Sequence, residues 1–330
     1  MFNEYDLIKS AKKLNKTIVF PEAGYSERIV NACKYIYKNK IAKVIMLGDE
    51  SALVLKHKKL KGITIINPKT SSFKSEFASS LYEIRKEKGM TIEQAEELIE
   101  NPIYFGTMMV KLGYADGMVC GAKTSTKDSL KPALQIIKVG KNSKLVSSCF
   151  IMCGKNKALG KDGVMVLGDC GLNENPDESK LADITMQINE FAKKVVNIEP
   201  KIALLSYSTL GSADGENPNK LRETLKLVKE KDSSIIIDGE MQLDAAICKD
   251  VNKTKAPNSE IKGDANCLIF GDLACGNITY KAMQRFGNIN AIGPITLGFD
   301  KPVNDLSRGC SIEEIILITA ITCIQASENK

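Results

Sequence analysis

Residues 17–48 read TIVFPEAGYSERIVNACKYIYKNKIAKVIMLG and decide the fold class. Two short runs rich in β-branched residues, 17–20 and 43–48, flank a stretch from 29 to 37 in which apolar residues recur at helical spacing. A strand, a helix and a second strand of this kind form a βαβ unit, and such units build a mostly parallel sheet. This stretch therefore predicts an α/β fold.

The same alternation continues along the chain of 330 residues. Further strands are predicted at 63–66, 117–120, 145–152, 164–167, 202–206, 234–238, 267–270 and 290–293. Helices are clearest at 91–100 and 183–196. Residues 312–326 form a strongly apolar helix, which must pack into a core.

The length of the chain predicts two domains, because single cores usually stop growing below this size. Polar residues at 140–143 separate a predicted helix from the next strand, and a second candidate boundary lies near Gly293-Pro294. We predict a discontinuous domain I of residues 1–142 plus 298–330 and a domain II of residues 143–297. If the terminal helix returns to domain I, the active site would lie in the cleft between the two lobes.

The composition is that of a soluble globular protein, with 43% hydrophobic and 26% charged residues. No apolar run reaches the ~18 residues that a membrane helix needs, and residues 1–6 lack the pattern of a signal peptide, so a cytoplasmic location without membrane contact is expected. The net charge of +6 is mild, and glutamates lie among the lysines. Nucleic acid is therefore disfavoured as a partner, whereas small polyanions remain.

The ten cysteines are scattered, and most lie among apolar or small residues, which favours buried free thiols over disulfides. There is no Cys-x-x-Cys pair, and the single histidine, His57, lies in the lysine-rich stretch 56–59. A zinc site is poorly supported, and no metal is expected. We expect His57 to be a solvated surface residue.

Two loops that follow predicted strands are rich in hydroxyl groups. Residues 121–132 contain Ser125 and Thr126, and residues 205–213 contain Ser208 and Thr209. Loops at the carboxyl ends of parallel strands bind ligands in α/β proteins, and hydroxyls beside the amides of a helix start suit a phosphate. Helix N-caps need the same residue types, however, and for each loop alone the cap is the favoured interpretation.

The densest cluster of polar residues lies between 293 and 315. Ser307 and Arg308 precede a helix that begins with a capping-box pattern, Ser311 followed by Glu314. A guanidinium can fork onto phosphate oxygens, and a hydroxyl can donate a hydrogen bond to an oxyanion. Glu314 either closes the capping box or acts as a carboxylate base, and the sequence favours the cap.

Residues 304–311, NDLSRGCS, closely resemble a signature of the phosphate acetyltransferase family. Further blocks resemble the same family in the family's order, at 20–22, 82–89, 204–209, 237–246, 255–257 and 276–281. The resemblance covers essentially the whole chain. It implies a two-domain α/β protein with mostly parallel, three-layer sheets of the isocitrate or isopropylmalate dehydrogenase type. It also implies a homodimer, an active site in the interdomain cleft and a terminal segment that returns to domain I.

The chemistry that the resemblance implies is a reversible acetyl transfer between acetyl phosphate and coenzyme A, giving acetyl-CoA and phosphate. The thiolate attacks directly in a ternary complex, and no metal or tightly bound cofactor is implied. Arg308 matches the arginine that binds the acyl phosphate, Ser307 matches a serine that steadies the transition state, and Arg85 matches an arginine of coenzyme A binding. The residues suit these roles, because a thiol of pKa near ~8.5 must lose its proton and a phosphate leaving group needs a cation.

Two residues depart from the family pattern. Glu314 stands where the family typically has an aspartate that deprotonates coenzyme A, and Lys131 stands where a second coenzyme A arginine is common. Lysine keeps the charge but loses the bidentate fork, so weaker coenzyme A binding is expected. The remaining substrate contacts are expected from Ser125, Thr126, Ser208, Thr209 and Lys255.

Three alternatives stay open at this point. The chain could prefer propanoyl or butyryl phosphate, because the acyl pocket cannot be sized from sequence. A nicotinamide-dependent decarboxylating hydroxyacid dehydrogenase shares the expected fold, but no set of aspartates resembles its metal site. An impaired relative that only senses acyl phosphate or coenzyme A is the non-enzymatic alternative, motivated by Glu314 and Lys131.

Overall fold

The computed structural model describes residues 4–328, and these residues form two compact units. We call residues 4–140 and 299–328 the terminal unit, and residues 141–298 the central unit. Each unit is a sheet with helices on both faces, which confirms the α/β class that the βαβ rhythm of residues 17–48 predicts.

The terminal unit contains a five-stranded sheet with the order β11-β4-β1-β2-β3. Every pair of neighbouring strands in it is parallel. The carboxyl ends of all five strands therefore lie at one edge of the sheet, where α/β proteins place their ligands. The strands are β1 Thr17–Phe20, β2 Lys43–Leu47, β3 Thr64–Ile66, β4 Gly117–Cys120 and β11 Val303–Asp305.

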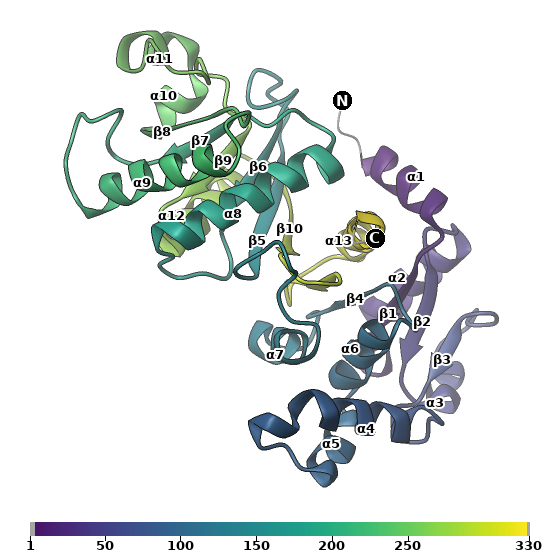
Figure 1. Ribbon diagram of the computed structural model, residues 1–330. Coiled ribbons are helices and arrows are strands. Elements are labelled where there is room, and N and C mark those ends of the chain that lie inside the picture. Colours follow the sequence, from purple (N-terminus) through teal and green to yellow (C-terminus); the bar gives the residue numbers. More distant parts are fainter. Residues whose placement is uncertain (1–3, 329–330) are drawn as a thin grey trace. The chain divides into compact units, whose positions relative to one another are not determined.

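Two groups of helices cover this sheet. In one group α13 packs against α1, α2 and the strands β1 and β4, and in the other α6 packs against α4, α5, α7 and the same two strands. Figure 1 shows the yellow α13 beside the purple α1, although they come from opposite ends of the chain. The bounds are α1 Glu4–Leu14, α2 Glu27–Lys38, α3 Glu50–Lys56, α4 Lys74–Arg85, α5 Ile92–Ile99, α6 Pro102–Leu112, α7 Thr126–Ile136 and α13 Ile312–Glu328, with the 3-10 turns η1 Pro21–Gly24 and η2 Lys86–Lys88.

The central unit contains a six-stranded sheet with the order β10-β5-β6-β9-β7-β8. The strand β5 is antiparallel to both of its neighbours, and the other pairs are parallel. The sheet is thus mixed at one edge and parallel elsewhere. The strands are β5 Ser147–Cys153, β6 Val164–Gly168, β7 Ile202–Leu205, β8 Ile237–Met241, β9 Cys267–Phe270 and β10 Asn290–Leu297.

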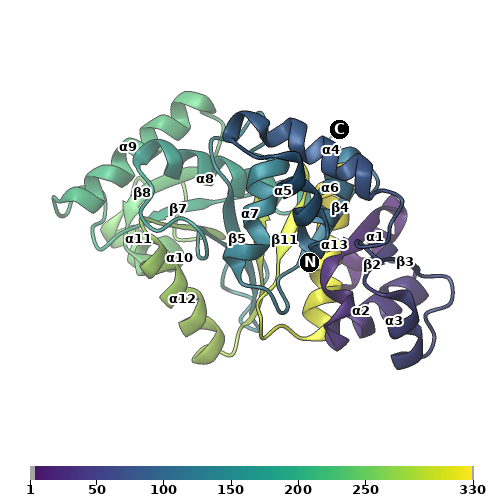
Figure 2. The same cartoon turned by 90° about the horizontal axis from the view of Figure 1, so that it is seen from below.

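The helices of the central unit also form two layers. In Figure 2, α8 and α9 lie on one side of the strands, and α10, α11 and α12 lie on the other. Against the second layer, a cluster of buried apolar side chains forms a core that includes Phe150, Leu167 and Leu268. The helices are α8 Glu178–Phe191, continued by the π-turn η3 Ala192–Val196, then α9 Glu216–Lys231, α10 Leu243–Ile247, α11 Lys249–Lys255 and α12 Leu273–Arg285.

All ten predicted strand ranges overlap observed strands. The largest error is β8, which spans Ile237–Met241 where residues 234–238 were predicted, because the strand includes the polar Glu240 held by hydrogen bonds. The strand β11 was missed, since it has only three residues and two of them are Asn304 and Asp305. No helix among residues 4–328 combines the length and apolar character needed to cross a membrane.

Candidate active site

Three loops meet at the carboxyl edge of the sheet in the terminal unit. They follow β1, β4 and β11, which are neighbours in the sheet and parallel. The loop after β4 leads into Ser125 and Thr126, and the loop after β11 carries Ser307 and Arg308. The parallel order of the strands thus brings these sequence-predicted residues to one edge, although about 180 positions separate them along the chain.

A buried carboxylate organises the loop after β4. Glu22, in η1, is fully buried and accepts hydrogen bonds at Oε1 from Lys123 N (2.9 Å), Thr124 N (2.8 Å) and Thr124 Oγ1 (2.7 Å). Its Oε2 accepts from Ala122 N (2.7 Å). These backbone amides form a concave anion site, which sequence reasoning offered to a phosphate. In the structure the carboxylate of Glu22 occupies it, so these three amides are already hydrogen-bonded within the protein.

An arginine fixes the loop that carries Arg308. The guanidinium of Arg28, on α2, donates hydrogen bonds to the carbonyl oxygens of Ala122 (2.9 Å), Arg308 (2.8 Å) and Cys310. One side chain thereby joins the loop after β4 to the loop after β11. Sequence reasoning missed Arg28 entirely, and it noted Glu22 only within a family block. Both side chains bind main-chain atoms, which every residue type has. The sequence of the bound loop therefore carries no sign of the contact.

The side chains of Ser307 and Arg308 are exposed, while the main chain of their loop is fixed. Ser307 Oγ accepts a hydrogen bond from Gly309 N (3.3 Å), and Ser307 O accepts one from Cys310 N (2.9 Å). A cation and a hydroxyl therefore stand side by side on a braced turn. Such a pair can bind phosphate oxygens and stabilise an oxyanion.

Glu314 closes the capping box that the sequence predicts at the start of α13. Its Oε2 accepts a hydrogen bond from Ser311 N (2.6 Å), and Ser311 Oγ accepts one from Glu314 N (3.1 Å). The helix-cap interpretation of Glu314 is therefore confirmed. Its carboxylate remains half-buried and is not consumed by the cap, because a carboxylate has several acceptor positions.

Asp305, the last residue of β11, is a buried acid that sequence reasoning did not single out. Its side chain is 2% exposed, and its Oδ1 has no hydrogen-bond partner. Burial raises the pKa of its carboxyl group from 3.8 to about 6, against lowering effects from the hydroxyls of Thr126 and Ser129 and from the charge of Arg308. The charge of Glu22 adds to the increase. No local pattern marks this acid, since an aspartate before a loop is ordinary.

The helices α4 and α7 carry the two residues predicted to bind coenzyme A. Arg85 ends α4, is half-buried, and has an Nε without a hydrogen-bond partner. Lys131 is exposed on α7, which packs against α4. Ser125 Oγ caps α7 by accepting from Asp128 N (3.2 Å), and Thr126 is exposed in its first turn. The cap interpretation of Ser125 is thus confirmed.

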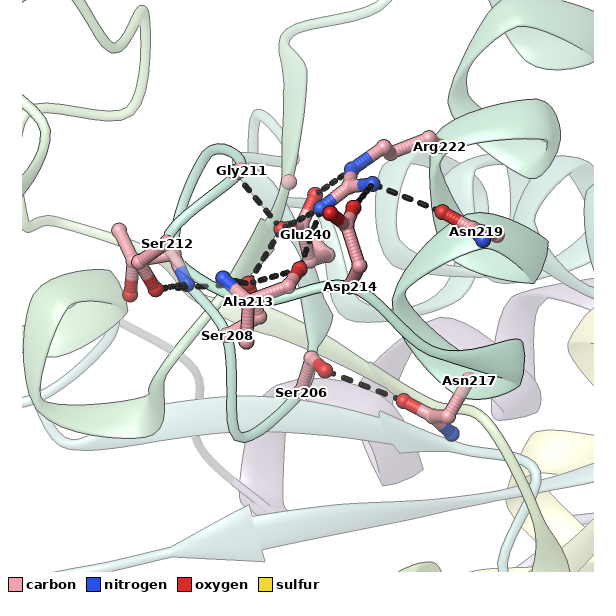
Figure 3. A network of polar contacts seen from close by, with 12 residues as sticks. Ser206, Ser208, Gly211, Ser212, Ala213, Asp214, Asn217, Asn219, Arg222 and Glu240 are labelled. Atoms are coloured by element: carbon pink, nitrogen blue, oxygen red, sulfur yellow. Dashed lines mark hydrogen bonds and ion pairs between the residues drawn. The ribbon is translucent and has the colours of Figure 1, made fainter.

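Ser208 and Thr209 lie in the central unit, in the loop after β7. Ser208 Oγ donates to Oε1 of the buried Glu240 (2.7 Å), which also binds Arg222 Nη2 (3.0 Å) and Gly211 N (2.9 Å), as Figure 3 shows. Thr209 Oγ1 accepts from Gln242 N (3.0 Å). Burial raises the pKa of Glu240, but Arg222 and the other donors outweigh it and leave the pKa below its ordinary value.

Lys255, the third predicted residue of the central unit, is paired with Asp244 Oδ2 (2.7 Å) and with Gln242 Oε1 (2.8 Å). All three predicted residues therefore have hydrogen-bond partners within the central unit, at the end of β8 or just after it. These contacts shape the ends of β7 and β8, whatever further contacts the residues make with a ligand.

Comparison with known proteins shows the family of the chain. The family described as phosphate acetyl/butaryl transferase matches residues 2–323. The chain belongs to this family. It is 47% identical over 322 residues to a phosphate acetyltransferase of Acetivibrio thermocellus, covering 97% of each chain. A phosphotransacetylase structure from Streptococcus pyogenes superposes with a TM-score of 0.92 at 39% identity, covering 98% of this chain and 99% of that one.

The fold of this phosphate acetyl/butaryl transferase reaches beyond the family. A putative 4-hydroxythreonine-4-phosphate dehydrogenase from Salmonella typhimurium superposes with a TM-score of 0.53 at 11% identity, over 94% of this chain and 99% of that one. This likeness concerns the fold alone, and it agrees with the dehydrogenase-type, two-domain α/β architecture that the sequence resemblance implies.

Two predictions about single residue types in the transferase can be compared with the structure. His57 is not the solvated residue expected, because its side chain is only 8% exposed; burial and the charges of Lys34 and Lys56 lower its pKa. All ten cysteines are free, as predicted, and seven are buried. Within residues 4–328, no group of three or more histidine, cysteine or acidic residues could hold a metal ion.

Proposed function

We propose that this chain is a phosphate acetyltransferase, which catalyses the reversible reaction of acetyl phosphate with coenzyme A to give acetyl-CoA and phosphate. The observation that carries the proposal is the braced turn of Ser307 and Arg308, held by Arg28 at the carboxyl edge of the sheet in a member of this family. Coenzyme A acts as a substrate, and no tightly bound cofactor is required.

The exposed guanidinium of Arg308 binds the phosphate oxygens of acetyl phosphate. The sulfur of coenzyme A attacks the acyl carbon as a thiolate, a carbon–sulfur bond forms, and the bond from the acyl carbon to the phosphate oxygen breaks. Ser307 donates a hydrogen bond to the oxyanion that forms on the way, and Arg308 stabilises the charge that collects on the leaving phosphate. Direct transfer in a ternary complex needs no covalent enzyme intermediate.

Glu314 is proposed as the base that takes the thiol proton. Glu314 lies six residues after Arg308, in the first turn of α13, and its carboxylate is held by Ser311 N. A carboxylate that is oriented by a hydrogen bond yet half-exposed can accept a proton. The capping box and the base are compatible roles, because the cap fixes the rotamer that the base needs.

Coenzyme A is proposed to bind along α4 and α7 of the terminal unit. Arg85 and Lys131 supply positive charge on these two packed helices for the phosphates of the nucleotide. The unpartnered, buried Nε of Arg85 is consistent with a contact that a ligand completes. Ser125, Thr126, Ser208, Thr209 and Lys255 stay predictions as further substrate contacts.

The test is release of coenzyme A from acetyl-CoA in the presence of phosphate, measured with a thiol reagent. We expect turnover by the native chain and a loss of about 10²–10³-fold for Arg308→Ala. Arg285→Ala, an exposed arginine of α12, is the matched control and should keep native activity. Turnover without phosphate, or an Arg308→Ala variant as active as the control, would refute the proposal.

The preferred acyl group is determined by comparing acetyl, propanoyl and butyryl phosphate as substrates in the reaction with coenzyme A. We propose acetyl phosphate as the best substrate, because the similar protein of Acetivibrio thermocellus is named a phosphate acetyltransferase. A higher kcat/KM with butyryl phosphate would instead place the chain with butyryl-transferring members. We further propose that the enzyme works in the cytoplasm. We also propose that it is a homodimer, which light scattering of the purified protein tests.

A further inference from the structure

Asp305 is an acid placed where its ionised form is poorly compensated. It ends β11, two residues before Ser307, with a side chain that is 2% exposed and an Oδ1 that lacks a partner. Its neighbour Ser129, on α7, is fully buried and also has an unpartnered side-chain oxygen. Buried polar atoms of folded proteins are nearly always hydrogen-bonded, so the Oδ1 of Asp305, beside a hydroxyl that lowers the pKa of the acid, needs an explanation.

Backbone crowding keeps this carboxylate in place. A Cβ added to Gly121 would lie 2.2 Å from Asp305 Oδ1 and 2.6 Å from Leu306 N, so only glycine fits beside the acid. Gly121 also has a positive φ of 98°, which favours glycine for a second reason. The chain thus approaches Asp305 closely on the side of β4.

The charged and titratable groups around Asp305 come from each element packed on it. Glu22 faces it from the turn after β1, Cys120 from β4, and Arg308 from its own loop. The helix α7 contributes the hydroxyls of Thr126 and Ser129. The helix α13, which also packs on β11, binds the preceding Asn304 through Thr322 Oγ1 (2.8 Å). Arg308 is therefore the positive charge in this set, and Glu22 is already paired with four donors.

We propose that Asp305 is a positioning residue, whose carboxylate holds the guanidinium of Arg308 over the end of β11 in the orientation that binds acyl phosphate. This inference rests on the proposed role of Arg308. Arg28 fixes the main chain of the loop, and Asp305 acts on the side chain. A neutral residue at this position would fit the fold better, because an ionised carboxylate in this setting is costly to bury. In this proposal the charge of the acid offsets that cost by orienting Arg308.

A consequence is that acyl phosphate binding weakens when Asp305 is protonated. The folded-state pKa of Asp305 is about 6, so its charge is present at pH 8 and lost as the pH falls through 6. The profile of kcat/KM for acetyl phosphate against pH should therefore have an acid limb near 6 that belongs to this residue. The ionisation of the substrate itself affects native and variant enzymes equally.

The experiment compares the pH profiles of the native enzyme, Asp305→Asn, Ser129→Ala and Asp116→Asn with acetyl phosphate as the varied substrate. At pH 8, Asp305→Asn should lose at least about tenfold in kcat/KM for acetyl phosphate with the KM for coenzyme A unchanged, and its limb near pH 6 should be absent. Ser129→Ala should keep native activity at pH 8 and move the limb to higher pH, because the hydroxyl lowers the Asp305 pKa.

Asp116→Asn is the control for a structural acid of the same sheet. Asp116 precedes β4 and binds Lys16 Nζ (3.1 Å) and Thr17 N (2.8 Å), so its variant should keep the native limb. A native profile for Asp305→Asn, or a limb that Ser129→Ala does not move, would overturn the proposal. If Arg308→Ala is inactive while Asp305→Asn keeps the native pH profile, the role of Asp305 is refuted and that of Arg308 stands. If Arg308→Ala is active, the proposed roles of both residues are refuted.

Discussion

Replacing Asp305 by asparagine should stabilise the folded enzyme at neutral pH, although the same change should lower its activity. The carboxyl pKa is 3.8 as a reference and about 6 in the fold, and one pKa unit corresponds to about 1.4 kcal/mol, so ionising the buried group costs about 3 kcal/mol. The folded state binds more protons than the unfolded state between pH 4 and 6. The free energy of unfolding therefore falls as the pH rises through this window, and asparagine, which is neutral at every pH, avoids the loss.

Urea unfolding at pH 4, 6 and 8, followed by circular dichroism, measures this effect. The variant should exceed the native enzyme by up to about 3 kcal/mol at pH 8, by less at pH 6, and by almost nothing at pH 4. Asp116→Asn, which breaks the contacts to Lys16 and Thr17, should lose stability at pH 8. An Asp305→Asn variant that is less stable than the native enzyme at pH 8, or equally shifted at all three pH values, would refute the reasoning.

Three further changes separate structural from chemical roles. Glu314→Gln keeps an acceptor for Ser311 N, so its thermal stability should match that of the native enzyme, whereas Glu314→Ala should lose about 1 kcal/mol of helix capping. If the carboxylate is the base, both variants should lose activity to the same extent. Arg222→Ala removes the positive partner of the buried Glu240 and should lower the urea midpoint, and a smaller loss when Glu240→Gln is added would show that the charge is the cause. Lys131→Arg should lower the KM for coenzyme A several-fold through the bidentate fork, and an unchanged KM in the thiol assay would argue against contact with coenzyme A there.

The sequence predicted the sheet-forming elements well because buried strands are written in runs of β-branched and apolar residues. Where a strand is held by polar contacts the pattern fails, as at β8, which is shifted toward Glu240, and at β11, which consists of a valine and two polar residues. The capping box of Ser311 and Glu314 was predictable because both members lie within one turn. Pairs such as Glu22 with Thr124 are about a hundred positions apart, and nothing local links them.

The site shows why a family motif identifies the reacting residues but not the groups that hold them. Ser307 and Arg308 are exposed side chains within the family signature, and their proposed roles depend on their own chemical groups, so they stand out in the sequence. Arg28 binds the carbonyl oxygens of Ala122 and Arg308, which every residue type possesses. A change in the loop sequence would leave those contacts intact. The role of Arg28 can therefore be recognised only once the order of the strands in the sheet is known.

Glu22 and Asp305 show how one strand edge gives two buried acids different roles. Glu22 accepts four hydrogen bonds from the loop after β4. These donors compensate the charge of its carboxylate, and the contacts fix the loop. Asp305 lies at the end of β11 with an unpartnered Oδ1. Its charge is therefore available to attract a nearby cation, and Arg308 is the one that lowers its pKa. Arg308 follows three residues later on a turn whose main chain is already held. In the proposed arrangement Arg28 fixes the main chain of the turn, and the charge of Asp305 orients the exposed guanidinium of Arg308.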